Sequence, residues 1–364
     1  MGNKASFSGN LFLLYDQNIR RTRQELDSNE IEGERTEFMN RPPESSTRVS
    51  HEDLHAFVSR ACQTVGLPED KAELLARMLS GNDLRGVFSH GTQQICTYAR
   101  LMRDGTLNSR PEVRIVKESP VSALMDGDGG LGYFPAHEGT RRAIEKAKAE
   151  GMAVMMTRNH GHFGAAGLYS RMTIEHDLIA FVTSGHQLHL KPGRSVYDAG
   201  GGSPMSFSAP TGEEDPVVLD FGTMHDLYGG SDHRKQLVEM APGLVLRCIG
   251  QGVICQSWGG LLAGIPLDAT KANRAFEGAN QGSMVIVMRI DLFSEPADFK
   301  REMDAYVRAV RDLEPLPGFD RSMLPGGPEA ERERWYREEG VPVSDRHKEQ
   351  FEKLADELGI KVPW

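Results

Sequence analysis

The chain has 364 residues, enough for about two domains, and its 39% hydrophobic and 26% charged residues are typical of a globular protein with a buried core. Its formal net charge is −10 and it contains no dense run of lysine and arginine, which excludes the basic stripe of a nucleic-acid-binding protein. A small anionic substrate remains compatible with this charge, because a pocket can be locally positive inside an acidic protein.

The cysteines and the apolar runs bear on the cellular compartment. Four cysteines occur and none forms a C-x-x-C pair, so we predict reduced thiols rather than a disulfide framework. The chain shows no charged-then-apolar signal segment, and no apolar run approaches the length of a membrane span. We therefore expect a cytoplasmic protein with no membrane partner.

The first third of the chain is predicted to be an extension followed by helices. Residues 1–46 are polar and irregular, and we interpret them as an N-terminal extension. Residues 47–120 form a mostly helical segment, with helices predicted from Ser50 onward, over 69–84 and over 95–102. The pair Ser50 and Asp53 resembles a capping box at the start of the first helix.

The middle of the chain alternates strands with helices, and the end returns to helices. Within 121–294 we predict strands over 122–125, 153–157, 178–183, 216–220 and 283–290, and helices over 135–150 and 165–175. This alternation indicates an α/β sheet domain. Residues 295–364 are charged and predict helices over 297–313 and 345–358.

A glycine-rich segment between a predicted strand and a predicted helix matches G-x-G-x-x-G at Gly127, Gly129 and Gly132. In a Rossmann fold such glycines admit a dinucleotide pyrophosphate to a helix N-terminus. The acidic residue expected after the next strand is missing, because that strand is followed by Arg158. A plain glycine-rich turn explains the segment equally well.

Two further segments carry imidazole groups. Ser89 and His90 follow Arg85 at a helix end, where they could supply a proton and hold an anion, or could simply cap the next helix. His160 and His162 follow the strand over 153–157, at the edge of the sheet where open α/β sheets bind ligands. The two histidines could be metal ligands, or one could be a general base assisted by a neighbour. The position favours such a functional loop, and the alternative is an imidazole that hydrogen-bonds the backbone.

Taken together, six segments are similar to one known family. They are DLRGVFSHG at Asp83, MDGDGGLG at Met125, EKAKAEGMAV at Glu145, RNHGHFGAAGLY at Arg158, VVLDFGT at Val217 and LPGGPEAERERWYREEGVPV at Leu324. Over about residues 49–362 the chain resembles the type 2 malate/L-lactate dehydrogenase family, which also contains ureidoglycolate, sulfolactate and diketogulonate oxidoreductases. The resemblance implies a homodimer, an α/β fold with a mixed, non-Rossmann sheet that binds NAD or NADP, and a helical second domain built from both chain ends.

The resemblance also implies roles for individual residues. His162 and His90 become the candidates for proton transfer, with Ser89 beside them. The substrate end is assigned to Arg85, Gln94 and His160. The predicted cofactor contacts are Ser184, His186, Ser203, Asp220, Phe221, Gly222 and Thr223, and we predict no metal ion at the site.

The chain departs from the family pattern on both sides of this site. The family usually has an arginine that clamps the substrate carboxylate three residues after the S-H-G glycine, where this chain has Gln94. Residues 200–204 and 222–224 replace the family's L-G-T-N-P and A-T-S sequences. The stretch over 229–261 is shorter than usual, the K-G-Y-G-L segment is absent, and no lysine occurs between Lys235 and Lys271.

Three functions therefore stay open from the sequence. The favoured one is hydride transfer between a nicotinamide cofactor and a small 2-hydroxy or 2-keto acid. The second is metal-assisted or cofactor-free chemistry on the same scaffold, with ligands drawn from His186, His189, His225, His233, Asp220 and Asp232. The third is a catalytically silent family member.

Overall fold

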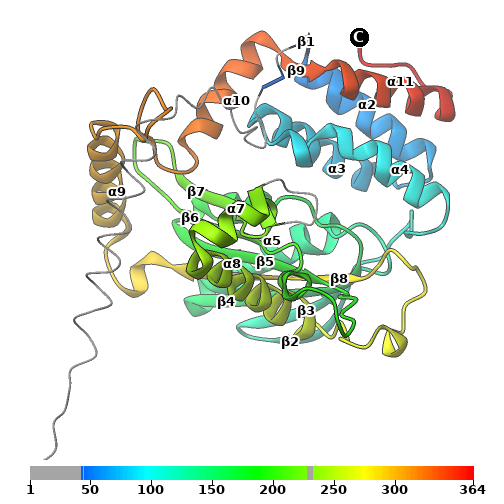
Figure 1. Cartoon of the computed structure of the whole chain (residues 1–364), viewed down its shortest axis with the longest axis horizontal. Coiled ribbons are helices and arrows are strands. Elements are labelled where there is room, and N and C mark those ends of the chain that lie inside the picture. Colours follow the sequence, from blue (N-terminus) through cyan, green and yellow to red (C-terminus); the bar gives the residue numbers. More distant parts are fainter. Residues whose placement is uncertain (1–41, 44, 228–232) are drawn as a thin grey trace, which may run out of the picture. The chain divides into compact units, whose positions relative to one another are not determined.

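The computed structural model in Figure 1 describes residues 42–43, 45–227 and 233–364. Residues 42–364 group into one unit by their contacts. Most of the predicted extension over 1–46 lies outside the described residues, and its last residue, Ser46, already begins a strand. The domain boundaries at residues 46, 120 and 294 stay predictions.

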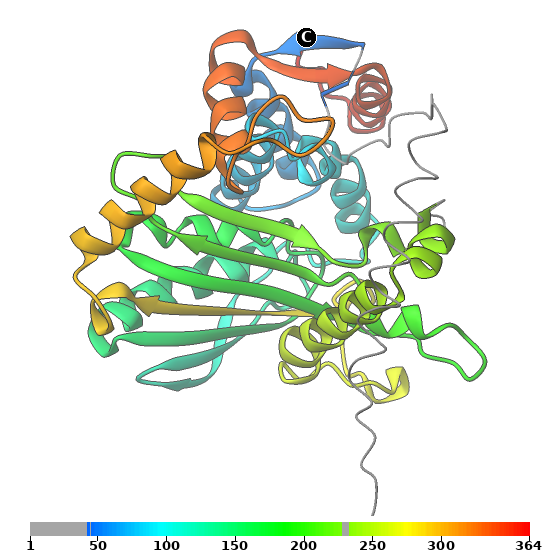
Figure 2. The ribbon, with the colours of Figure 1, turned by 60° about the vertical axis from the view of Figure 1, so that its left-hand side comes forward.

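A seven-stranded mixed sheet forms the centre of this unit (Figure 2). Its strand order is β2 (Arg114–Ser119), β3 (Ser122–Asp126), β4 (Met152–His160), β8 (Gln281–Arg289), β5 (Leu178–His186), β6 (Pro204–Ala209) and β7 (Val217–Gly222). Only β3 and β4 are parallel neighbours, and every other adjacent pair is antiparallel. The predicted mixed, non-Rossmann α/β sheet is confirmed, and a doubly wound parallel sheet is excluded.

Helices pack on both faces of the sheet because its strands alternate their side chains between the two. On one face α5 (Tyr133–Glu150) lies over β4, with Gly139 against Met155, and α6 (Gly167–Arg171) lies over β6, with Ser170 hydrogen-bonded to Ser206. On the other face α8 (Pro242–Cys255) continues into the π-helical turn η6 (Gln256–Leu261). There Trp258 packs edge-on against Phe181 of β5.

The two ends of the described chain meet in one helical group, coloured blue and red in Figure 1. Helices α2 (His51–Thr64), α3 (Glu69–Leu84) and α4 (Ile95–Arg103) pack with α10 (Gly327–Glu339) and α11 (Asp345–Leu358). The strand β1 (Ser46–Val49) pairs with β9 (Val341–Ser344), and Phe57 stacks on Phe351 at 4.3 Å between ring centroids. Ser50 accepts a hydrogen bond from the Asp53 backbone N–H at 3.0 Å, as the cap motif predicts.

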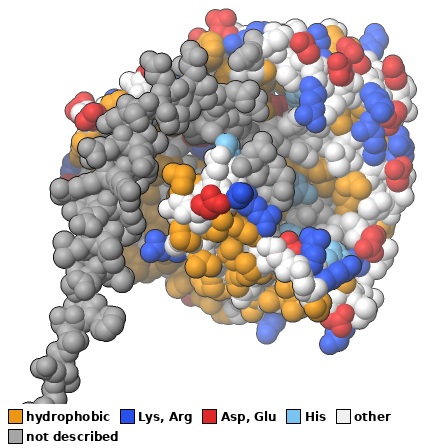
Figure 3. Space-filling model, in the orientation of Figure 1, with side chains coloured by type: hydrophobic (Ala, Val, Ile, Leu, Met, Phe, Trp, Pro, Cys, Tyr) orange, Lys and Arg blue, Asp and Glu red, His pale blue; other side chains and the backbone are white. Residues whose placement is uncertain are grey.

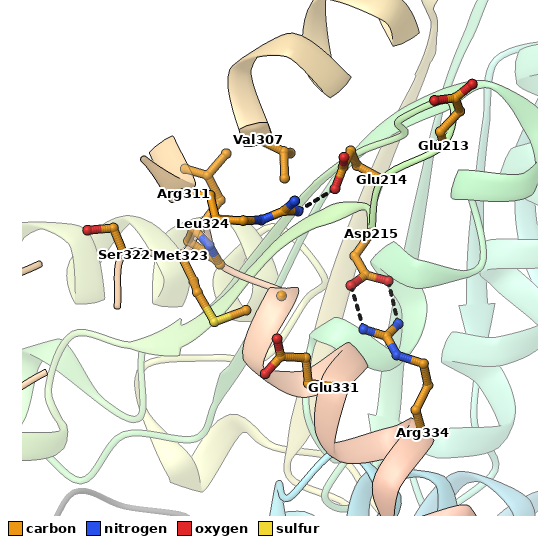
Figure 4. A pocket seen from close by; sticks show the side chains of 12 residues that line it. Glu213, Glu214, Asp215, Val307, Arg311, Ser322, Met323, Leu324, Glu331 and Arg334 are labelled. Carbon is orange, nitrogen blue, oxygen red and sulfur yellow. Dashed lines mark hydrogen bonds and ion pairs between the residues drawn. The ribbon is translucent and has the colours of Figure 1, made fainter. Parts of the chain in front are cut away.

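A charged joint holds α9 (Pro296–Arg311) and α10 to the turn between β6 and β7. Asp304 accepts hydrogen bonds from three successive backbone N–H groups, those of residues 212–214. Figure 4 shows the adjoining cleft, where Arg311 is bonded to Glu214 and Arg334 to Asp215. Each of these arginines has a carboxylate partner, so this cleft is a structural joint rather than a ligand site.

Several elements differ from the sequence prediction. The strands β2 and β6 and the helices α7 (His233–Met240) and α8 were not predicted. Three of them have a weak sequence pattern: β2 is polar and exposed, β6 starts with proline, and α8 contains three glycines. The helix predicted over 165–175 is only α6 followed by a 3-10 turn, η3 (Ile174–His176). The other 3-10 turns are η1 (Phe88–His90), η2 (Thr92–Gln94), η4 (Val196–Gly200), η5 (His225–Leu227), η7 (Ala269–Lys271) and η8 (Ile290–Leu292).

Among the helices in the described ranges, none is by itself long and apolar enough to cross a membrane. Helices α7 and α8 with η6 reach that length and composition only as a pair, and they are bent by 114° at their junction.

Candidate functional site

The structure brings together the three residues predicted to be catalytic. His90 lies on η1 directly after α3, and His162 lies in the loop after β4. Their imidazole ring centroids are 5.4 Å apart, and Ser89 Oγ is 2.9 Å from His90 Nδ1. Residues that are more than 70 positions apart in sequence therefore face one another across a short gap, as a proton-transfer site requires.

Two tyrosines complete this cluster, and sequence reasoning missed both. The Tyr98 hydroxyl is 2.5 Å from His162 Nδ1 and 3.3 Å from the Tyr133 hydroxyl. Both tyrosines are buried, and burial raises the pKa of each phenol above its ordinary value, so both stay protonated. Tyr98 shares the buried face of α4 with Ile95, Ala99 and Met102, so its sequence pattern is that of a core residue.

Burial keeps the histidines of the cluster neutral. Removal from water, followed by the nearby His90 and His160, lowers the pKa of His162 to about 3. Burial also lowers the pKa of His90. A neutral imidazole has one nitrogen that can accept a proton, and Tyr98 occupies Nδ1, so Nε2 of His162 is the atom left for a reactant.

The turn that carries His90 is anchored by a buried carboxylate. Asp83 accepts hydrogen bonds from the backbone N–H of Thr92 at 3.0 Å and from its hydroxyl at 2.5 Å. A Cβ at position 91 would lie 1.7 Å from Asp83 Oδ1, so only glycine fits there. Burial raises the pKa of Asp83 to about 7. The DLRGVFSHG segment is thus explained by packing around Asp83 as well as by chemistry.

His160 does not fit its predicted substrate contact. Its side chain is fully buried, with Nε2 at 2.7 Å from Thr157 Oγ1 and Nδ1 at 2.7 Å from the Gly161 carbonyl oxygen. Because both ring nitrogens are occupied inside the protein, His160 holds the shape of the loop that presents His162. Burial lowers its pKa to about 4.

The glycine motif supports the same loop. A Cβ at Gly132 would lie 2.5 Å from His160 Nδ1, and one at Gly127 would lie 2.8 Å from His160 Cβ. A Cβ at Gly129 would lie 2.2 Å from the Phe276 ring. These glycines allow close packing of protein segments, and the sheet around them is not that of a Rossmann fold.

Arg85 and Gln94, both predicted at the substrate end, take different positions. Gln94 Nε2 donates to the Ser89 carbonyl oxygen at 2.6 Å, so it supports the turn beside His90. Arg85 turns toward α10, where its Nε lies 3.0 Å from Glu333 Oε2. Arg85 lines a separate cleft whose lining includes neither His90 nor His162.

Ser184 and His186 lie at the same edge of the sheet as the His162 loop. Gln281 of β8 is the register partner of both His160 and His186. Adjacent strands are about 5 Å apart, so His186 is about 10 Å from the base of that loop. Two register positions further into the sheet, Ser184 pairs with Ser283, whose hydroxyl is 2.6 Å from Thr157 Oγ1.

The remaining predicted cofactor residues lie at the start of β6 and at the end of β7. Ser203 Oγ accepts from the backbone N–H of Met224 and from Thr223 Oγ1, each at 3.0 Å. Phe221 and Gly222 pair with Met205 and Pro204 in the sheet. Asp220 is held against the start of α6, where a Cβ at Gly167 would lie 2.5 Å from its carboxylate, and burial raises its pKa to about 6.

A cleft of about 910 Å³ opens beside these residues, a volume within the usual range for a cofactor site. Its walls include His186, Gly201 and Gly202, with two arginines, Arg194 and Arg234. Arg194 forms an ion pair at 2.8 Å with Asp198 of the same lining. The Arg234 guanidinium lies 3.7 Å from the centroid of the Tyr197 ring. Bare glycine backbone beside Arg234 and the Tyr197 ring suits a ligand that carries phosphates and a ring.

The ligands proposed for a metal site do not converge. Across the described ranges, no group of three or more histidine, cysteine, aspartate or glutamate side chains is close enough to hold a metal ion. Asp232, which belonged to that hypothesis, lies outside the described residues.

Comparison with known proteins identifies the family of the chain. The family model described as malate/L-lactate dehydrogenase matches residues 49–243 and 243–352. The chain belongs to the malate/L-lactate dehydrogenase family. The two matched pieces of this family model meet at residue 243, inside the stretch over 229–261 that the sequence marks as shortened.

Curated members of the family are dehydrogenases with different named substrates. Malate dehydrogenase of Pyrococcus horikoshii is 24% identical over 351 residues, covering 87% of this chain and 97% of that protein. L-sulfolactate dehydrogenase of Methanocaldococcus jannaschii is 28% identical, covering 82% and 93%. Ureidoglycolate dehydrogenase (NAD(+)) of Escherichia coli K12 is 24% identical with the same coverage.

Solved structures of family members share the fold. The structure of malate dehydrogenase from Pyrococcus horikoshii superimposes with a TM-score of 0.76 at 25% identity, covering 88% of this chain and 98% of that one. Sulfolactate dehydrogenase from Methanocaldococcus jannaschii superimposes with a TM-score of 0.69 at 23% identity. The family fold is therefore present over nearly all of the described residues.

Proposed function

We propose that this protein is an oxidoreductase that transfers a hydride between a nicotinamide cofactor and a small 2-hydroxy or 2-keto acid. The observation that carries the proposal is the contact of neutral His162 with Tyr98 and His90 at a sheet edge. The dehydrogenase names of the relatives support it.

The cofactor would occupy the cleft lined by Gly201, Gly202, Arg194 and Arg234. When bound, a nicotinamide ring accepts or gives a hydride. Arg234, with Arg194 beside its partner Asp198, would hold the phosphates, and His186 would line the cleft on the side of the His162 loop. Neither NAD nor NADP is favoured by these residues, since both carry the pyrophosphate that the arginines would bind.

His162 would handle the proton of the substrate hydroxyl. In the oxidation direction the hydroxyl proton passes to Nε2 of His162 as the hydride leaves the carbinol carbon, and reduction reverses both transfers. Tyr98 would fix the ring through Nδ1, accepting its hydrogen while donating its own to Tyr133. A positioned general base of this kind contributes about 10²- to 10⁴-fold to the rate.

His90 and Ser89 would bind the same substrate oxygen from the other side of the gap. Gln94 would offer the substrate carboxylate a neutral amide in place of a cation. We therefore expect weak binding of simple 2-keto acids and better binding of substrates with further polar groups.

An uncovered apolar surface supports a homodimer. Large side chains on α8 and η6 are exposed, including Leu246 and Leu262 at 65% each, and Phe207 and Leu219 are exposed on the adjoining sheet face. Figure 3 shows hydrophobic side chains gathered on the face of the molecule where α8 lies in Figure 1. A patch of this kind marks a protein interface, and a second copy of the chain is its proposed occupant.

Light scattering at micromolar concentration should give twice the 40.3 kDa chain mass, and monomers alone would contradict the dimer.

The unpaired state of all four cysteines is consistent with a reducing compartment, and we propose the cytoplasm.

The decisive experiment separates cofactor binding from turnover. NADH and NADPH are titrated against the protein while cofactor fluorescence is recorded, and malate, sulfolactate and ureidoglycolate are then tested as substrates. We expect binding of at least one cofactor and oxidation of at least one acid. No fluorescence change with either cofactor up to millimolar concentration would overturn the proposal.

A further inference from the structure

A second cleft, of about 830 Å³, lies between α3 of the helical group and α6 on the sheet. Four arginines line it: Arg77 and Arg85 from α3 and its end, Arg171 from α6, and Arg337 from α10. Glu175 is the one carboxylate in that lining, and it is exposed beside His176. The lining therefore carries a surplus of positive charge in a protein whose net charge is negative.

Nearby carboxylates offset only part of this surplus. Glu333 forms salt bridges with two of the arginines, at 3.0 Å from Arg85 Nε and 2.6 Å from Arg337 Nη2. Arg77 and Arg171 form no salt bridge with any described carboxylate. The joint in Figure 4 is different, because each of its arginines has its own acidic partner.

The cost of burying a positive charge in this cleft is clearest at Arg171. Burial, and next the nearby Arg85, lower the pKa of Arg171 from its ordinary value, although Glu329, Asp220 and Glu333 act in the opposite direction. A guanidinium keeps its proton at physiological pH. A bound anion, rather than deprotonation, would therefore offset the cost of burying this positive charge. Such a group pairs best with carboxylate or phosphate oxygens.

The same cleft has an apolar wall. Leu74 and Met78 lie one turn apart on α3, and the cleft is also lined by Leu168 of α6 and by Met172, directly after that helix. A ligand that satisfies both walls has an apolar body and anionic groups. We propose that this cleft binds a small organic anion with at least two negative charges, as phosphate or carboxylate, at a site separate from the His90–His162 pair.

The separation rests on the lining, which includes neither catalytic histidine. The cleft is formed by elements of both the helical group and the sheet, so an occupant would bridge the two. Binding to the folded state alone would raise the unfolding temperature.

Calorimetric titration with phenyl phosphate and with inorganic pyrophosphate tests the proposal on the full chain. We expect saturable binding by the wild type that weakens as salt is added. Arg171→Gln and Arg77→Gln should each weaken this binding at least tenfold. The matched control is Arg346→Gln, because Arg346 is exposed on α11 and lies outside the cleft. Unfolding temperatures of the three variants, measured without ligand, show whether each one folds.

Other outcomes would overturn the inference. Failure of both probes to bind up to 10 mM, or equal weakening in Arg346→Gln, would show that the cleft has no such site. If NADH displaced the probes over the same concentration range in which NADH itself binds, the probes would occupy the cofactor site and not this cleft. Cofactor fluorescence is measured independently, so loss of the second site would leave the proposed dehydrogenase function standing.

Discussion

Tyr98 Oη lies 2.5 Å from His162 Nδ1, and this bond determines which imidazole nitrogen is available for chemistry. Tyr98 is a core residue of α4 in the helical group, whereas His162 follows a strand of the sheet. The bond therefore couples the packing of the two parts of the fold to the position of the proposed base.

The two histidines of the loop should respond differently to removal. His162→Ala should lower turnover at least about a hundredfold with little change in cofactor affinity, because the lost interaction belongs to the transition state. His160→Ala should instead lower the free energy of unfolding by about 2–4 kcal/mol, because it empties a fully buried position. Turnover, cofactor titration and urea unfolding of both variants check this pair. A larger loss of turnover in a stable His160→Ala protein would reverse the assignment.

Tyr98→Phe should lower kcat about tenfold while the dissociation constant of the cofactor stays unchanged. The variant keeps the packed ring and loses only the hydroxyl that holds His162, a bond of about 1–2 kcal/mol. Tyr133→Phe is the matched control, since its hydroxyl is 3.3 Å from Tyr98 and is not bonded to His162. Equal losses in the two variants would point to general packing rather than to positioning of the imidazole.

Gln94→Arg should raise kcat/KM for a simple 2-keto acid about tenfold. The guanidinium would restore a charged donor for the substrate carboxylate, and charge-assisted hydrogen bonds contribute about 1.5–3 kcal/mol. Gln93→Arg serves as the control, because Gln93 donates to the Phe88 carbonyl oxygen in the same turn. A gain in both variants would indicate a general effect of added charge, and no gain in either would remove Gln94 from the substrate end.

Acid should destabilise the protein partly through His347. Burial lowers the pKa of this imidazole to about 4, and its ring packs edge-on against Phe351. The unfolded chain binds the proton near the ordinary pKa of 6.5, so stability present above that pH is lost as pH falls toward 4. Between pH 7 and pH 5 the loss from this residue is about 2 kcal/mol.

Urea unfolding of His347→Leu at the two pH values isolates this contribution. The variant should lose about 2 kcal/mol less than the wild type between pH 7 and pH 5, whatever its stability at pH 7. An unchanged difference between the two pH values would mean that His347 titrates normally in the folded protein.

The sequence alone was sufficient for the α/β class, the family and the candidate histidines. Strands and helices with strong apolar periodicity, such as β4, β5 and α3, follow from local pattern because their burial repeats along the chain. His90 and His162 could be singled out because each follows such an element at a predictable edge. Weakly patterned elements, such as exposed β2 and glycine-containing α8, could not.

Only the tertiary structure determined which side chains contact one another. Gly127 and Gly132 fit a phosphate loop in sequence, and their contact with His160 shows that they serve packing instead. Tyr98 has the pattern of a core residue, and its role depends on a bond to a residue 64 positions away. Arg77 and Arg171 line one cleft although 94 positions separate them in the sequence. The local sequence pattern indicates which side chains of one element are buried. A site is formed by side chains that long-range packing brings together, and these contacts leave no periodic pattern in the sequence.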